Sequence, residues 1–414
     1  MPLARRSLLK SASLSLLGLT ALPPFLARAA EALPTGRRKV LVTLFLRGGA
    51  DGLSLVPPVG DPDYHRLRPN LALGAPGTGD GSALRLDDTF GLHPGLAPLL
   101  PWWKEGALAA VHAVGLPQPV RSHFDAQDFV ESGTPGVKAT RDGYLNRALA
   151  ALPTEATASA FRAVALQPTL PRALAGDAPA LALESLERFR LLAPGRTGPI
   201  SFDSLYAAAV DEALRSTGLE TSSALSHVAD KRLADQPPHH GAAYPRSPLG
   251  RRLQDLARLI HADVGLQLAA TESGGWDTHI LQGRERGPFT QRAKDLGESL
   301  AAFATDLGPR LEEVLVVVLT EFGRTARENG NRGTDHGTGG TVLLLGGKVR
   351  GGRVLGPWKG LAEPYLLDGR DVPSLTDLRA VLAEALMTHC GLATTEPVFP
   401  GLGSPPTLPG LLGG

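Results

Sequence analysis

Several short stretches of this 414-residue chain are apolar at nearly every position. Val40–Leu46 is a clear example, because six of its seven residues are apolar. A strand that is buried on both faces of a parallel sheet has this pattern, whereas a half-exposed strand alternates apolar with polar positions. We therefore expect buried strands at 40–46, 107–114, 163–166, 264–270, 314–319 and 341–345.

Between these runs, apolar residues recur every three or four positions, which is the spacing of one face of a helix. Residues 249–261 follow this spacing, with Ser247 as the expected N-cap. Residues 289–307 repeat it, and so do residues 374–389, for which Ser374 is the expected cap. The alternation of strands and helices predicts an α/β fold with a mostly parallel central sheet flanked by helices.

The N-terminal residues have the features of an export signal. Arg5 and Arg6 precede an apolar stretch at 14–26 and an A-x-A pattern that ends at Ala29. An uncleaved membrane anchor is the alternative, but the apolar stretch is too short to cross a bilayer. We expect residues 1–29 to be a twin-arginine signal peptide. The twin-arginine export machinery is then a partner, and the mature protein is periplasmic or secreted.

The mature chain, residues 30–414, is interpreted as a single domain with one unusual section. Residues 150–245 are rich in alanine, leucine and serine, and they end in a proline-rich linker that contains His239 and His240. We expect this section to be a helical insertion that covers one side of the sheet. The two linker histidines are expected to be exposed.

Charge and cysteine content argue against several kinds of partner. The chain has 42 basic and 41 acidic residues and a net charge of +1, which gives no reason to expect nucleic acid. Beyond the signal peptide no apolar run reaches the length of a membrane span, so we expect no stable span. The one cysteine, Cys390, excludes an internal disulfide.

Three glycine-containing segments place acids and histidines beyond predicted strands: 48–52 (GGADG), 274–279 (GGWDTH) and 333–337 (GTDHG). Ligands bind at the carboxyl ends of strands in an open α/β sheet. Carboxylates and imidazoles there predict a site for one or more divalent metal ions, which could be Zn²⁺, Mg²⁺, Mn²⁺ or Ca²⁺. The expected ligands are Asp51, Asp277, His279, Asp335 and His336.

Each of these residues also has a structural explanation. Asp277 and His279 are two positions apart, so both can reach one ion from an extended segment, but Asp277 could instead cap a helix. Asp335 and His336 are adjacent and would diverge in a strand, although a glycine-rich loop lets them face one site or bind two ions. Asp51 could stand in a simple turn.

Residues 320–325 follow the apolar run Val314–Leu319 and add two charged candidates. Glu321 is a further candidate metal ligand. Arg324 is a candidate catalytic residue that could hold an anionic substrate group by a bidentate contact. A surface ion pair between the two residues is the alternative.

Ser122 stands at the expected start of a helix, after the strand at 107–114. Amide donors and the positive end of the helix dipole favour an anion or an attacking oxygen at such a position. Ser122 is therefore the candidate nucleophile, and it would need a base or a metal to activate it. Alternatively, Ser122 caps the helix with Asp125 as its capping-box partner, and the two roles can coexist.

Taken together, segments 46–52, 122–127, 274–279, 320–324 and 333–337 resemble those of a bacterial family of unknown function. Its members are exported by the twin-arginine route and are grouped within the alkaline phosphatase and sulfatase superfamily. The resemblance extends from about residue 39 to residue 392. It implies an alkaline-phosphatase-like fold and a metal-dependent hydrolase of phosphate or sulfate esters, with a small-molecule or glycan ester as substrate.

The resemblance also implies roles for particular residues. Asp51 corresponds to a metal ligand, Ser122 to the nucleophile, and Asp277 with His279 to the ligands of one ion. The chain departs from the superfamily pattern after Val314–Leu319, where Glu321 stands in place of an Asp-His pair. One ligand of a two-metal centre is then missing.

Two other functions therefore remain open. One is a catalytically silent metal- or glycan-binding protein on the same fold. The other is a metal-free serine esterase, against which the absence of a G-x-S-x-G motif around Ser122 counts.

Overall fold

A computed structural model describes residues 38–79, 81–153, 159, 161–191, 232–403 and 411–413. The predicted signal peptide lies outside the described residues, and so does the middle of the predicted insertion, residues 192–231. In the described part, no helix is long and apolar enough to cross a membrane.

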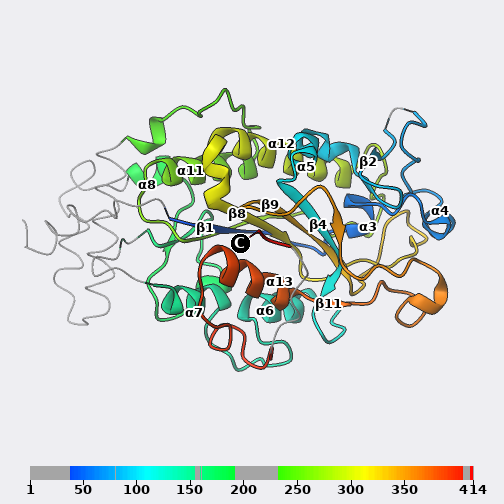
Figure 1. Cartoon of the computed structure of the whole chain (residues 1–414). Coiled ribbons are helices and arrows are strands. Elements are labelled where there is room, and N and C mark those ends of the chain that lie inside the picture. Colours follow the sequence, from blue (N-terminus) through cyan, green and yellow to red (C-terminus); the bar gives the residue numbers. More distant parts are fainter. Residues whose placement is uncertain are drawn as a thin grey trace, which may run out of the picture.

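The centre of the structure is a nine-stranded sheet in which β1 (Val40–Leu46) lies between β7 (Leu268–Ser273) and β8 (Val314–Leu319) (Figure 1). Both neighbours run parallel to β1. All the residues of β1 and β8 are buried, as the continuous apolar runs predicted. The other strands of this sheet are β4 (Leu108–Gly115), β5 (Ala163–Ala165), β6 (Leu181–Ala182), β9 (Gly340–Gly346), β10 (Val354–Leu355) and β11 (Thr376–Asp377).

The strand β9 is antiparallel to its neighbours β8 and β4, whereas the other pairings of this sheet are parallel. The reason lies in the connection from β8 to β9, residues 320–339, which contains no helix. A parallel neighbour would need a crossover, usually through a helix, so the chain turns back instead. The prediction of a mostly parallel sheet with flanking helices is confirmed.

Helices cover both faces of the sheet (Figure 1). On one face lie α11 (Pro248–His261) and α12 (Pro288–Leu307), and on the other lie α6 (His123–Ser132), α7 (Tyr144–Ala151) and α13 (Leu378–Glu384). Side chains of β1 alternate between the two faces, because successive residues of a strand point in opposite directions. Val42 and Leu44 belong to the core beneath α11 and α12, whereas Leu41 and Phe45 belong to the core beneath α6, α7 and α13.

The remaining elements are short. The helices are α3 (Gly52–Leu55), α4 (Pro62–Leu67), α5 (Leu100–Lys104) and α8 (Leu186–Leu191), and β2 (Leu84–Arg85) pairs with β3 (Gly91–Leu92). Short 3₁₀-helices occur at Pro94–Leu99, Arg172–Leu174, Leu233–Asp235, Gly308–Glu313 and Glu363–Tyr365, and a π-helical turn at Ala385–His389 extends α13.

Three expectations need correction. The strand predicted at 264–270 begins at Leu268 and continues through polar residues to Ser273, since Val264 is buried without joining the sheet. The expected cap Ser374 lies before α13, and Asp377 caps that helix by accepting a hydrogen bond from the backbone of Arg379. The described part of 150–245 contributes β5 and β6 to the sheet edge, so it is not purely helical.

Candidate metal centre

Four loops meet at one edge of the sheet. Because β1, β7 and β8 are parallel, the segments that follow them leave from the same edge, and the antiparallel β9 begins there. The strand β4 also ends at this edge and leads into α6. A bridge between Arg324 and His336 pairs the segment after β8 with the segment before β9. The topology thus brings together residues that are 198 positions apart, such as His123 and Glu321.

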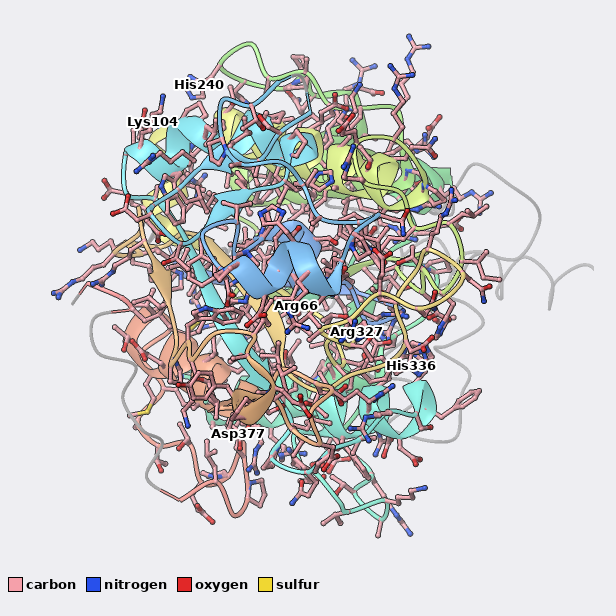
Figure 2. All side chains as sticks on the ribbon, turned by 90° about the vertical axis from the view of Figure 1, so that its right-hand side faces the viewer. Arg66, Lys104, His240, Arg327, His336 and Asp377 are labelled. Carbon is pink, nitrogen blue, oxygen red and sulfur yellow. The ribbon has the colours of Figure 1, made fainter. Side chains whose placement is uncertain are left out.

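Three histidines surround the carboxylate of Asp277. Its Oδ1 atom lies 3.0 Å from Nε2 of His279 and 3.3 Å from Nε2 of His336. Its Oδ2 atom lies 3.5 Å from Nε2 of His123. These four side chains, which we call the His₃Asp cluster, are between 23% and 45% exposed, so solvent or a small molecule can reach them. Figure 2 shows His336 near the helix α6.

Each histidine uses its other ring nitrogen to contact an acceptor behind it. Nδ1 of His123 lies 2.8 Å from Oε1 of Glu321, and Nδ1 of His279 lies 3.1 Å from Oδ1 of Asp335. Nδ1 of His336 lies 2.8 Å from the backbone carbonyl of Arg121. A carboxylate or a carbonyl can only accept, so each Nδ1 is placed to donate a proton. In the neutral form of such a ring, Nε2 presents a lone pair.

Two contacts bear on what these nitrogens could bind. Nε2 of His123 is buried and has no hydrogen-bond partner among the described residues. Nε2 of His279 and Nε2 of His336 lie only 2.9 Å apart, and two lone pairs at that distance repel each other unless a proton or a metal ion lies between them. In a tetrahedral site with bonds of about 2.0–2.1 Å, the ligand atoms lie about 3.3 Å apart. Ligand atoms of His123, Asp277 and His336 all lie within 4.8 Å of one another, so these three residues fit one metal ion, and His279 lies beside them.

Glu321 lies behind the cluster rather than in it. Its side chain is fully buried, and Oε1 accepts hydrogen bonds from His123, from Nε2 of Gln127 and from the backbone of Gly48, each 2.8–2.9 Å long. Burial by itself would raise the pKa of Glu321, but the hydrogen bonds, with that from His123 the strongest, lower it to about 2. The same hydrogen bond raises the pKa of His123. Glu321 therefore orients a histidine, as carboxylates often do at metal sites.

Asp335 has the same relation to His279. Its Oδ1 atom accepts from that ring and, at 3.0 Å, from the amide of Asn329. The hydrogen bond from Asn329, followed by the one from His279, lowers the pKa of Asp335 below its usual range. Glu321 and Asp335 were both predicted as metal ligands. Each accepts a hydrogen bond from a histidine of the cluster and lies behind that ring.

Arg324 lies below the cluster with a side chain that is fully buried. It donates to Oδ1 of Asp277 at 2.6 Å and to the backbone carbonyls of Gly48, Gly49, Trp276 and Thr334. These acceptors belong to three different loops, so the guanidinium ties the loops together. We predicted that Arg324 could hold a substrate anion. Its buried position gives this contact no support, because the guanidinium nitrogens already donate to acceptors within the protein.

Asp277 is ionised in this setting. Partial burial opposes ionisation, but the hydrogen bond and the charge of Arg324 lower the pKa of Asp277 below its usual value. Burial lowers the pKa of His336, so that ring stays neutral more readily. A carboxylate and neutral imidazoles are the protonation states that metal binding requires.

Asp51 is not one of the residues around Asp277. Its carboxylate is completely buried and pairs with Arg68, with distances of 2.6 Å and 3.1 Å from the two guanidinium nitrogens to Oδ2 and Oδ1. Ser54 and Gln282 donate to Oδ2 as well. Burial opposes ionisation, but the charge of Arg68 keeps the pKa of Asp51 below its usual value. The predicted metal ligand is thus a partner in a closed ion pair.

A close approach of backbone holds Asp277 in place. Gly48, which follows β1, has a φ of +117°, and a β-carbon at this position would lie 2.5 Å from the backbone nitrogen of Asp277. Only glycine allows the loops after β1 and β7 to touch in this way. The glycines of segment 48–52 therefore allow the close packing that the sequence suggested, whereas a β-carbon at Gly274 would meet no atom within 4 Å.

Ser122 is exposed and caps α6, since its Oγ accepts a hydrogen bond from the backbone of Asp125 at 3.5 Å. The capping explanation of this serine is confirmed. Its position directly before His123 also places it next to the cluster in sequence. A role as nucleophile stays a prediction.

Sequence reasoning missed His123 and Arg68. His123 stands between Ser122 and Phe124 in a segment that was singled out for its serine, and nothing local distinguishes a histidine that faces a metal site. The available signal was its place one residue into a helix after a buried strand. Arg68 gives no local signal, because its partner is 17 residues away.

The structure is that of an α/β protein with a candidate metal centre at the carboxyl edge of its sheet. The family model described as "Protein of unknown function (DUF1501)" matches residues 38–387, and the chain belongs to this family. A search of curated proteins found no match. Among solved structures, the PsFucS1 sulfatase from Pseudoalteromonas sp. is similar with a TM-score of 0.37 and 12% identity, over 90% of this chain and 72% of that one.

Proposed function

We propose that the His₃Asp cluster binds one divalent transition-metal ion and that the protein is an exported hydrolase of phosphate or sulfate esters. The observation that carries the proposal is the convergence of three Nε2 lone pairs on Asp277, with each Nδ1 proton already donated elsewhere. The resemblance to the alkaline phosphatase and sulfatase superfamily, found in the sequence motifs, supplies the fold and the ester chemistry of this proposal.

The donor set favours certain ions over others. Imidazole nitrogens suit Zn²⁺ and its first-row neighbours, whereas Mg²⁺ and Ca²⁺ prefer oxygen ligands. Three histidines and one carboxylate thus favour Zn²⁺ among the four ions considered from the sequence, with Mn²⁺ second. Because Glu321 and Asp335 lie behind histidines, the His₃Asp cluster provides for one ion and not for two.

A divalent ion in this cluster supplies Lewis-acid polarisation of an ester oxygen. The residues of the chain do the rest. Arg324 holds Asp277 from below, Glu321 holds His123, and the open side of the cluster admits the substrate. Ser122 at the start of α6 is the proposed nucleophile, since its hydroxyl keeps a proton to release while its oxygen caps the helix.

Two exposed apolar residues are sequence neighbours of histidines in the cluster, and they indicate what kind of substrate the site could accept. Phe124 next to His123 is 91% exposed, and Ile280 next to His279 is 63% exposed. Exposed apolar groups beside a metal site favour an ester whose other half has an apolar or ring-shaped face, such as an aryl group or a sugar. A small-molecule or glycan ester fits this description.

Metal binding is tested first, by elemental analysis of the purified protein after dialysis against Zn²⁺. We expect one equivalent to be lost in His336→Ala and kept in His65→Ala, which removes an exposed histidine whose hydrogen bond goes to the backbone of Val59. Equal Zn²⁺ content in the two variants would exclude the cluster as a metal site.

Hydrolysis is tested with a panel of aryl phosphates and aryl sulfates. We expect activity to disappear with a chelator and to return with Zn²⁺, and Ser122→Ala to abolish it without changing metal content. Ser247→Ala is the control, because Ser247 caps α11 in the same way with a hydrogen bond of 3.0 Å to the backbone of Gly250. Activity that survives the chelator would indicate a metal-free serine esterase.

Export is tested by replacing Arg5 and Arg6 with lysine, which should retain the precursor in the cytoplasm. Normal export of this variant would remove the twin-arginine route from the proposal.

The second candidate function is a catalytically silent metal- or glycan-binding protein. The burial of Arg324 favours it, since no anion-binding guanidinium faces the cluster from that position. A protein that holds one equivalent of Zn²⁺ at the cluster but cleaves no ester of the panel would favour this function over hydrolysis.

A further inference from the structure

A second group of possible metal ligands lies at the opposite edge of the sheet. His261 ends α11, Asp306 lies in the last turn of α12, and His239 belongs to the proline-rich linker. The two helices lead into β7 and β8, so their C-terminal ends lie at the amino ends of those strands. A six-residue strand is about 20 Å long, which separates this group from the His₃Asp cluster. Figure 2 shows His240 and His336 on well-separated parts of the molecule.

Both imidazoles direct a nitrogen at the same oxygen. Nδ1 of His239 lies 3.2 Å and Nε2 of His261 lies 3.3 Å from Oδ1 of Asp306. Donor atoms of a tetrahedral site with metal bonds of about 2.0–2.1 Å lie about 3.3 Å apart, so both distances match. The ring centroids of the two histidines are 4.0 Å apart, so the rings lie next to each other.

Hydrogen bonds already connect the three residues of this group. Oδ1 of Asp306 accepts a hydrogen bond of 2.7 Å from the backbone nitrogen of His239. Nε2 of His261 lies 3.1 Å from the backbone carbonyl of Asp306, so this ring has an acceptor besides the carboxylate. Oδ2 accepts from the hydroxyl of Tyr244 at 2.9 Å, so the other oxygen is engaged too. One ligand atom from each of the three residues nevertheless lies within 4.8 Å of the other two, which is close enough to hold one metal ion.

The surroundings keep the carboxylate charged and leave room for a further ligand. The side chain of Asp306 is 2% exposed, that of His261 is 18% exposed and that of His239 is 50% exposed. One side of the group therefore opens to solvent, where water can complete the coordination. Gly308, with a φ of +52°, follows α12, and a β-carbon there would lie 2.6 Å from Nε2 of His240.

We infer that His239, His261 and Asp306 form a second, structural site for Zn²⁺ or a similar transition-metal ion. The ion joins the linker to the C-terminal ends of α11 and α12. Two imidazoles and one carboxylate are a donor set that Zn²⁺ uses, and ions such as Mg²⁺ prefer oxygen. The site is independent of the proposed hydrolase, because it shares no residue with the His₃Asp cluster.

The test uses full-length protein that lacks the first cluster through His279→Ala and His336→Ala. Titration with Zn²⁺ should show one remaining equivalent, and adding His239→Ala should weaken its binding by at least 10-fold. Adding His65→Ala instead should change nothing. Co²⁺ should give the visible absorption of a low-coordinate site in the first protein and lose it with His239→Ala.

The structural role of the second metal site is tested by measuring thermal stability. Because an ion that binds only the folded state stabilises it, Zn²⁺ should raise Tm in the protein without the first cluster, and less so after His239→Ala. His239 is half exposed, so its loss should leave the apo fold intact. Absence of a remaining equivalent, or an equivalent that His239→Ala leaves unchanged, overturns the inference. Neither result bears on the first cluster, whose metal content is measured separately.

Discussion

Two aspartates follow buried parallel strands of the same sheet, and the structure gives them opposite surroundings. Asp51 after β1 is completely buried and is matched by a bidentate arginine, Arg68. Asp277 after β7 has a side chain that is 45% exposed and faces three histidines. Position at the end of a strand is therefore not enough to make a metal ligand. The partner that reaches the carboxylate decides its role.

The physical difference lies in desolvation. A buried carboxylate must be compensated by a counterion and hydrogen bonds, and Asp51 has both from Arg68, Ser54 and Gln282. Both oxygens are engaged by buried protein groups. Asp277 keeps access to solvent, and Arg324 takes one of its oxygens without enclosing it. The open carboxylate can exchange water for a metal ion at lower cost.

The largest effect is expected when the buried ion pair between Asp51 and Arg68 is broken. Arg68→Met leaves Asp51 buried without a counterion, which should lower the free energy of unfolding by about 3–5 kcal/mol in urea denaturation. Arg66→Met is the control, since Arg66 pairs with Asp63 at the surface of the same helix, α4. It should cost about 1 kcal/mol or less. Similar losses in both variants would contradict the contrast between the two aspartates.

The next largest effect is expected for Asp277, the aspartate that keeps access to solvent. Asp277→Asn should remove most of the Zn²⁺ affinity, by about 100-fold or more, because a neutral amide replaces the charged ligand. The apo protein should lose less unfolding free energy than Arg68→Met, since Asp277 is half exposed and solvent screens the pair that it forms with the buried Arg324. Elemental analysis and urea denaturation measure the two quantities. A variant that unfolds easily but keeps its metal would reverse the assignment.

A smaller effect on metal affinity is expected for Glu321, which lies behind His123. Glu321→Gln keeps an acceptor for Nδ1 of His123 but removes the charge, so Zn²⁺ affinity should fall by about 10–100-fold while the Co²⁺ spectrum keeps its shape. Glu131→Gln is the control, because Glu131 is a buried carboxylate that pairs with Arg47 instead. If Glu321 bound the ion directly, the spectrum itself would change.

The smallest effect is the loss of stability at acidic pH. Burial lowers the pKa of His112 from 6.5 to about 4, and this ring contacts the backbone carbonyl of Val56, close to Asp51. Between these pH values the unfolded chain binds more protons, so stability is complete above pH 6.5 and falls as the pH falls. From pH 7 to pH 5.5 His112 alone should cost about 1 kcal/mol of unfolding free energy.

That part of the pH dependence should be absent in His112→Gln and present in His65→Gln, which changes an exposed histidine. Urea denaturation at the two pH values measures it. His93 and His389, whose pKa values burial also lowers to about 4, keep the rest of the acid sensitivity in both variants.

Much of the fold was predictable because burial on both faces is recorded directly in the residue pattern. The runs at Val40–Leu46 and Val314–Leu319 are strands with those bounds. Where apolar residues are buried without pairing, as at Val264, the same pattern misplaced a strand by four residues. The direction of β9 followed from the helix-free connection before it, which could have been inferred from the sequence but was not.

The residue pattern was enough to predict which loops crowd the sheet edge, since glycines, acids and histidines gather after buried strands. It did not indicate which side chains face one another there, because that depends on the fold. The fold placed Glu321 behind His123, buried Arg324 under Asp277, and brought His239 against Asp306. These pairs are 198, 47 and 67 residues apart. The role of a carboxylate depends on the charges and donors within a few ångströms, and those neighbours come from distant parts of the chain that only folding brings together.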